Sequence, residues 1–287
     1  MEQSESLRAR IKNLVDTLTP KQKQIARFIL DNQYFTSFAS ANELGKKNNT
    51  TAATVVRFSQ TLGYEGYSQM QNVLRSEFPD HITTTARMQK RMSAITPPAS
   101  NPQQVFYTDI KNIERTAISI SEKNLNAALD AIQKAQRILV IGAGLSSAPV
   151  TFLAHSLKVM GFDALDIHGE GLHSAVEMAR IKPDDLLIAV DLWRYVRMTV
   201  NAVSHAQETG VSIIAITDSI VSPLAQKADI AFTIATEGVA HSLSITALMS
   251  LLNVIVAMLA DRVPEQVYAS LQRVDAAYRS NDLLIMM

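Results

Sequence analysis

Five short apolar segments, separated by stretches long enough for a helix, constrain the fold of this 287-residue chain more than any other feature. They are rich in Ile, Val, Leu and Ala and occupy residues 137–142, 163–167, 186–191, 212–218 and 230–236. Strands that are buried on both faces are continuous apolar runs, and a helix between two strands favours parallel pairing. The pattern therefore predicts a five-stranded parallel sheet between two helical layers, an α/β three-layer domain.

The first 78 residues follow a different pattern, because their apolar residues recur at helical spacing. Thr19 and Pro20 form a typical helix start, with Thr19 as the N-cap and Pro20 in the first turn. Gly63 suits the left-handed residue that ends many helices. This segment therefore predicts an all-α domain of short helices.

Helical periodicity fades after residue 78, and Pro97-Pro98 interrupts the chain before it returns. One helical segment is expected at residues 105–136, between the two domains. The apolar tail at 283–287 is expected to pack on the body of the protein or on a second subunit. We predict an all-α domain at residues 1–78, a linker at 79–104 and an α/β domain at 105–287.

The net charge of zero conceals a difference between the two parts. Residues 1–92 carry 13 Lys and Arg against 8 Asp and Glu, whereas residues 93–287 carry 14 against 19. A basic first third indicates a polyanionic partner. The absence of cysteine excludes disulfides, a thiol nucleophile and Cys-ligated metal. No apolar run reaches the ~18 residues of a membrane span, so we expect a cytoplasmic protein without a membrane partner.

Two short helices, expected at residues 40–46 and from about 52 to 62, have the spacing of a helix-turn-helix motif. In the second helix, the residues that can pack inward are Val55, Val56, Phe58 and Leu62. The opposite face carries small residues, Thr hydroxyls and one Arg, which let a backbone approach the major groove and reach base edges or phosphates. The candidate DNA-binding residues are Thr51, Ala52, Ala53, Thr54, Arg57 and Gln60.

Two strings in this region carry a family resemblance. TPKQKQIARFIL at residues 19–30, and TVVRF at 54–58 followed by LGYEGY at 62–67, resemble the N-terminal domain of RpiR-family transcriptional regulators. The chain departs from the family where Asn48-Asn49 replace a Gly-containing turn, where Thr50 replaces an apolar residue, and where Thr51 replaces Ser. The resemblance implies binding to double-stranded operator DNA, and the departures are expected to affect which operator is bound.

A Gly- and Ser-rich loop, GAGLSSA, follows the first predicted strand at residues 142–148. Its glycines let backbone N–H groups converge beside a helix N-terminus, and its serines add hydroxyl donors, so the loop can hold a phosphate or carboxylate. One interpretation is a dinucleotide fingerprint that lacks its third Gly, with Asp166 as the ribose acid. The other is the first loop of a sugar isomerase (SIS) domain, which it resembles and in which G-x-G-x-S opens a phosphosugar site.

The SIS resemblance extends through Thr217-Asp218 and Ser222–Ala225, and in RpiR-type regulators such a domain follows the helix-turn-helix. The two resemblances imply a homodimer or homotetramer whose paired heads bind an inverted repeat. The loop after the third strand departs, because Asp191 replaces the usual Ser and repels a phosphate unless Arg194 or Arg197 offsets it. The effector is then a sugar phosphate, another small anion or a sugar. The candidate effector-binding residues are Gly142, Gly144, Ser146, Ser147, Asp191, Arg194, Thr217, Ser219, Glu237 and His241.

Three functions follow from these patterns. Glu237 and His241 provide the carboxylate and imidazole of an aldose–ketose isomerase, so a phosphosugar isomerase is the alternative to a regulator, and an NAD-linked enzyme is a third hypothesis. The six His residues lack the spacing of a helix zinc site, and no G-x-S-x-G elbow occurs. We expect no metal, no cofactor and no catalytic residue. The prediction is a two-domain, metabolite-controlled transcriptional regulator, with the helical segment at 105–136 as the lever between its domains.

Overall fold

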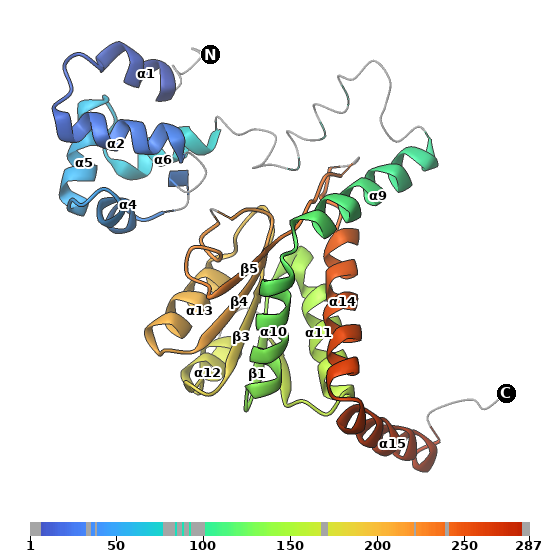
Figure 1. Ribbon diagram of the computed structural model, residues 1–287. Helices are drawn as coiled ribbons and strands as arrows, with labels where there is room; N and C mark the ends of the chain where they lie inside the picture. Colours follow the sequence, from blue (N-terminus) through green and yellow to red (C-terminus); the bar gives the residue numbers. More distant parts are fainter. Residues whose placement is uncertain are drawn as a thin grey trace. The chain divides into compact units, whose positions relative to one another are not determined.

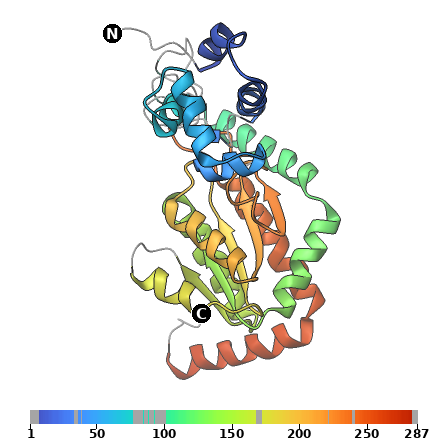
Figure 2. The same cartoon turned by 90° about the vertical axis from the view of Figure 1, so that its left-hand side faces the viewer.

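The computed structural model describes residues 7–32, 36–37, 39–76, 84, 88, 92, 101–167, 172–220, 222–238 and 241–282. Contacts divide the chain into two compact units, one formed by residues 1–95 and the other by nearly all of 96–287. Figures 1 and 2 show the elements of each unit. The predicted tail at 283–287 and most of the predicted linker lie outside the described residues.

The N-terminal unit is all-α, as predicted. One apolar cluster joins its helices, and Ile25, Leu44 and Phe58 within it are fully buried. Each side chain of this size stabilises the fold by ~1.5–3 kcal/mol when it leaves water. The helices are α1 (Leu7–Leu14), α2 (Pro20–Asp31), α4 (Ala41–Lys47), α5 (Ala52–Thr61) and α6 (Tyr67–Ser76).

Polar caps determine where three of these helices begin. The Gln22 side chain accepts the backbone N–H of Thr19 at 2.9 Å, while the Thr19 hydroxyl accepts the N–H of Gln22, which completes a capping box before α2. Ser40 and Glu43 form the same box before α4. Thr51 caps α5. A cap of this kind stabilises a helix by ~1 kcal/mol, and the predicted helix starts are confirmed to within one residue.

The C-terminal unit is a five-stranded parallel sheet covered by helices on both faces, as predicted (Figure 1). The strands pair in the order β2-β1-β3-β4-β5 and are β1 (Ile138–Ile141), β2 (Ala164–Ile167), β3 (Leu186–Val190), β4 (Ser212–Thr217) and β5 (Ile230–Thr233). The helices are α9 (Pro102–Ser119), α10 (Glu122–Lys134), α11 (Ser147–Val159), α12 (Leu172–Ala179), α13 (Arg197–Glu208), α14 (Thr246–Arg262) and α15 (Pro264–Ser280), with the 3₁₀ turn η1 (Gly144–Ser146) before α11.

Alternate residues of the central strands face opposite helical layers. Val140 and Ile188 pack with α10, α11 and α14, whereas Leu139 and Leu187 pack with α12 and α13. The strand order reverses between β1 and β3, because β2 lies on the far side of β1. In sheets of this topology, ligands bind outside the carboxyl ends of the strands at this reversal, so the loops after β1 and β3 border the candidate crevice.

The predicted single helix at residues 105–136 is wrong, because two helices, α9 and α10, occupy this segment. Between them Ile120 is extended, with ψ 117°, and its side chain packs against the core. The Ser121 side chain then accepts the N–H of Asn124 at 3.4 Å and caps α10. Since Ile120 is an apolar residue that packs against the same core, the hydrophobic pattern gives no sign of the break.

The last two helices differ in burial. Leu248, Leu251 and Leu252 of α14 lie within the core, while α15 buries Ser270 and leaves Tyr268 exposed. Among the described residues, no single helix has both the length and the apolar composition to cross a membrane. Only α14 and α15 taken together have that length and composition, and the two helices are bent by 105° relative to each other.

Candidate DNA-binding helix and ligand site

A tight turn joins α4 to α5. A Cβ atom on Gly45 would lie 2.9 Å from the carbonyl oxygen of Thr50, so only glycine lets α4 approach the turn this closely. Asn49 has φ 50°, the left-handed conformation that Asn tolerates better than most residues. Asn49 therefore supplies the left-handed residue of this turn without a glycine.

Helix α2 holds this turn in place. The ammonium group of Lys21 donates to the carbonyl oxygen of Asn48 at 2.7 Å. The Asn48 side chain is buried and donates to the carbonyl oxygen of Leu44 at 2.9 Å. The turn between α4 and α5 is thus held by one bond from α2 and one bond to α4.

The predicted DNA-binding residues of α5 lie on its solvent side. Val55 and Phe58 are fully buried on the opposite side. The Thr51 hydroxyl accepts the N–H of Thr54 at 3.3 Å and lies 3.1 Å from the Thr54 hydroxyl, so both act in the helix cap. The Arg57 side chain makes no bond to another described residue. Thr51, Ala53, Arg57 and Gln60 are exposed, and Ala52 and Thr54 are half-buried.

The N-terminal unit also contains a groove of about 630 Å³ that sequence reasoning missed. It lies along α1 and α2, where Ile11, Val15 and Leu30 form apolar walls and Lys23 and Arg27 add positive charge. None of the predicted DNA-binding residues lines it. Its apolar residues follow the same helical spacing as the core, so the sequence pattern does not distinguish the two.

In the C-terminal unit, the two glycines of the loop after β1 serve different purposes. A Cβ atom on Gly142 would lie 2.4 Å from the carbonyl oxygen of Val190, so Gly142 is required by the contact between β1 and β3. Gly144 has φ 59° and open space around it, so it is required by the backbone conformation of the loop. Ser146 is buried and Ser147 is half-buried at the start of α11. Of these four predicted effector-binding residues, Gly142 therefore has a structural role, because it lets β1 and β3 lie close together.

Asp191 lies on the other side of the crevice, at the end of β3, with a residue exposure of 2%. Its carboxylate Oδ2 accepts the N–H of Val196 at 2.6 Å. Burial raises the pKa of Asp191 to about 7, although the bond from Val196 favours the charged form. The nearby charge of Asp218 makes a smaller contribution to the same rise. The predicted repulsive group is thus part of the internal structure of its loop.

The rest of this loop contains an unusual backbone. Trp193 has φ 68°, a conformation that costs a bulky residue of the order of 1–3 kcal/mol, and its side chain is buried. The exposed Arg194 guanidinium lies 4.7 Å from the centre of the Trp193 ring, within the range of a cation–π contact. Tyr195 donates to Asp218 at 2.7 Å, which ties the loop to the end of β4. Sequence reasoning did not select Tyr195 or Asp218.

The predicted residues after β4 and β5 fall into two groups. Thr217 is fully buried at the end of β4, and its hydroxyl lies 3.4 Å from Asp218, next to Ser219. Glu237 and His241 are both exposed. No described contact joins Glu237 or His241 to the loops after β1 and β3.

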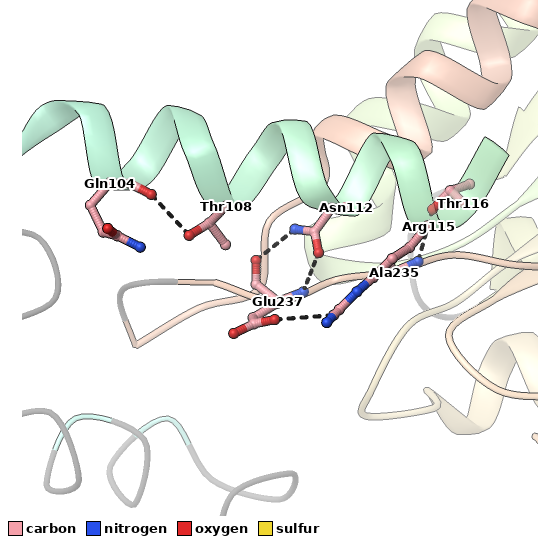
Figure 3. Close-up of polar contacts among 7 residues, drawn as sticks. All are labelled: Gln104, Thr108, Asn112, Arg115, Thr116, Ala235 and Glu237. Carbon is pink, nitrogen blue, oxygen red and sulfur yellow. Dashed lines mark hydrogen bonds and ion pairs between the residues drawn. The ribbon is translucent and has the colours of Figure 1, made fainter. Parts of the chain in front are cut away.

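Helix α9 holds the segment after β5 (Figure 3). Asn112 donates to the carbonyl oxygen of Glu237 at 2.7 Å and accepts its N–H at 3.2 Å, while Thr116 accepts the N–H of Ala235 at 3.0 Å. The carboxylate of Glu237 is paired with Arg115 at 3.2 Å. These partners are more than 100 positions apart in the chain, so no local pattern indicated them.

Two other predicted chemistries can be placed. Asp166, the candidate ribose acid, lies within β2 and forms an ion pair with Lys158 at 3.1 Å. No group of three or more His, Asp or Glu residues capable of holding a metal ion occurs among the described residues. The acid that the dinucleotide interpretation needs for the ribose is therefore already paired with a lysine.

Comparison with known proteins adds a family context to this geometry. Residues 5–81 match the helix-turn-helix domain of the rpiR family, and residues 131–260 match the SIS domain. An HTH-type transcriptional regulator of Haemophilus influenzae is 25% identical over 80% of this chain and 80% of that protein.

Solved structures extend the comparison. The sugar isomerase domain of an RpiR transcription factor from Sphaerobacter thermophilus is 40% identical, with a TM-score of 0.60, covering 61% of this chain and 98% of that one. The NanR protein of Vibrio vulnificus, solved in complex with ManNAc-6P, is 24% identical, with a TM-score of 0.64, covering 94% of this chain and 97% of that one.

Proposed function

The chain belongs to the RpiR family of transcriptional regulators, and from this premise we propose that α5 binds operator DNA while the crevice after β1 and β3 binds a small anionic metabolite. The observation that carries the proposal is the combination in one chain of an exposed, capped helix α5 with a sheet whose order reverses beside a Gly-Ser loop. The domain limits at 1–78 and 105–287 remain part of this proposal.

The DNA surface rests on the exposed side of α5. Small residues at its start allow close approach to the floor of the major groove, and Arg57 is long enough to reach a guanine edge or a phosphate. Lys46 and Lys47 lie exposed at the end of α4, where they add positive charge for phosphate contacts. A partner of this kind also agrees with the basic composition of residues 1–92.

The effector site rests on Gly144, Ser146 and Ser147 after β1 and on Arg194 after β3, with Thr217 and Ser219 after β4. The NanR structure contains ManNAc-6P, a sugar phosphate, and supports the same class of effector here. A helix start such as that of α11 favours an anion because its backbone N–H groups point toward the ligand.

Control of DNA binding requires a second copy of the chain. Phe106 and Ile118 of α9 and Tyr268 of α15 are large apolar side chains that stay exposed, and a second copy is the partner we propose for them. A homodimer or homotetramer then presents paired α5 helices to an inverted repeat. The effector alters DNA affinity by ~1–3 kcal/mol if it favours one arrangement of these heads. We propose α9, in place of the single helix expected earlier, as the lever.

The test is a mobility-shift and fluorescence-anisotropy experiment with DNA from upstream of the chain's own gene. We expect specific retardation at physiological salt and a change in affinity of roughly fivefold to 150-fold on addition of the effector. A thermal-shift screen of sugar phosphates and other anions identifies it, since a ligand at 100 times its Kd adds ~2.7 kcal/mol of stability. Absence of specific DNA binding would refute the proposal.

We also propose that the chain is not a catalyst. Glu237, the carboxylate expected to transfer a proton in isomerisation, is exposed and paired with Arg115. A group in this role works best in a site from which water is excluded. Assay of hexose and pentose phosphate turnover tests this point. Efficient turnover, together with no binding to promoter DNA, would favour the phosphosugar isomerase. We propose a cytoplasmic location for the protein, because its proposed DNA partner lies there.

A further inference from the structure

The carboxylate of Asp191 lies at the start of α13, a position that attracts an anion. Its Oδ2 accepts the N–H of Val196 at 2.6 Å, and Val196 directly precedes α13 without a side-chain cap of its own. The unpaired N–H groups at a helix start carry partial positive charge, which stabilises a carboxylate or phosphate placed there. In this chain an internal carboxyl group takes that position, and it is an anion above about pH 7, the pKa that burial gives Asp191.

A second observation marks the same position as an anion site. Thr199, on the first turn of α13, is fully buried, and its hydroxyl oxygen has no hydrogen-bond partner among the described residues. The hydroxyl lies close enough to Asp191 to favour the charged carboxylate, although not in the geometry of a hydrogen bond. A buried hydroxyl here can donate to an anionic group at the start of α13, which is the place that the Asp191 carboxyl takes.

The loop after β1 differs in this respect. Ser146 precedes α11 and does not cap it through its side chain, and neither Ser146 nor Ser147 hydroxyl bonds to another described residue. Gly144 is exposed and leaves open space beside its Cα atom. Of the two helix starts that border the crevice, that of α11 is therefore available to a ligand and that of α13 is occupied.

We propose that Asp191 is a specificity-determining residue, an internal carboxyl group that fills the start of α13 and excludes a second anionic group of the effector. The inference rests on the proposed effector site and names its ligand class. The effector presents one anionic group to the loop after β1 and a neutral, hydrogen-bonding portion toward β3. A metabolite with an anionic group at each end is excluded, because the Asp191 carboxyl already accepts the Val196 N–H and takes the place that a second anionic group needs. When this carboxyl is ionised, its charge repels such a group as well.

The experiment uses inorganic phosphate as the probe and the full-length protein, with the Val196 amide observed by NMR. Asp191→Ser removes the carboxylate and opens its space, while Asp191→Asn removes the charge but keeps an oxygen that accepts the Val196 N–H. We expect phosphate to shift the Val196 amide in Asp191→Ser, with a gain in affinity of about tenfold or more over the unmodified protein. Asp191→Asn retains the bond to the Val196 N–H, so its affinity for phosphate should rise little.

Two results would overturn the inference: phosphate that shifts the Val196 amide of the unmodified protein, or an Asp191→Asn variant that gains as much as Asp191→Ser. The first needs no variant, so the inference remains testable if the substitutions disturb folding, which circular dichroism detects. DNA binding is measured separately. If the protein does not bind operator DNA but phosphate shifts the Val196 amide in Asp191→Ser, the proposed function is refuted and this inference stands.

Discussion

The two units expose their functional residues in opposite ways. On α5 the candidate DNA-binding side chains project into solvent from a helix whose other side forms the core, and Arg57 is exposed beside the buried Phe58. In the crevice, Ser146, Asp191 and Thr217 are themselves buried. Binding and folding are therefore separable on α5, where neighbouring residues do different work. They are coupled in the crevice, where the same residues do both.

The largest effect is expected inside the N-terminal unit. Phe58→Ala removes a fully buried ring and should lower the free energy of unfolding of that unit by ~3–5 kcal/mol. Denaturant unfolding of the full chain measures it. A change confined to the transition of the N-terminal helices supports independent units, and an equal loss in the sheet domain would break the comparison.

In the crevice, stability should depend on pH through Asp191. Its pKa is about 7 in the folded protein against 3.8 when unfolded, so the native state keeps a proton that the unfolded state loses. The contribution to the free energy of unfolding therefore falls by about 4 kcal/mol as pH rises from about 4 to about 7, and is constant above. Urea titrations across this range test the sign. In Asp191→Asn this component of the slope should vanish.

Arg57→Ala should separate binding from folding. We expect operator affinity to fall by ~1–3 kcal/mol if Arg57 contacts a base, with the unfolding transition unchanged. Titration of labelled operator at several salt concentrations distinguishes the cases, because loss of a phosphate contact alone also reduces the salt dependence. Lys123→Ala, which removes one exposed positive charge from the sheet domain, is the control. Unchanged affinity in Arg57→Ala, with intact circular dichroism, would exclude the α5 assignment.

Thr51 should combine both roles on a smaller scale. Thr51→Ala removes the cap of α5 and should cost ~1 kcal/mol of stability, whereas Thr51→Ser keeps the hydroxyl that accepts the Thr54 N–H. Thermal unfolding of the two variants gives the difference. If Thr51→Ala lowers DNA affinity while Thr51→Ser restores it, the cap also orders the surface that binds DNA.

The smallest effect is expected at Glu237. Its ion pair with Arg115 is exposed, and such pairs contribute ~0–1 kcal/mol. Glu237→Gln should therefore leave the unfolding free energy almost unchanged. It should also leave effector binding unchanged, as measured by thermal shift, because no described contact joins Glu237 to the crevice. A large loss of binding would move this residue back into the effector site.

The sequence predicted the elements well and their ends less well. Apolar runs located all five strands, although the fifth ends at Thr233 rather than at residue 236. Caps such as Thr19 and Thr51 are local signals, since a side chain bonds to a backbone group a few residues away. The sequence pattern did not predict the break at Ile120, because this residue is apolar and packs against the same core as the helices on either side.

The amino-acid sequence alone determined the two domains, the helix-turn-helix, the parallel sheet and the family, because these depend on periodicity, caps and motifs within short segments. Only the tertiary structure decided what surrounds each candidate group. It showed that Gly142 accommodates Val190, that Glu237 is tied to α9, and that Asp191 bonds the start of α13. Burial and electrostatic environment depend on strands and helices distant in the chain, and no local pattern encodes those neighbours.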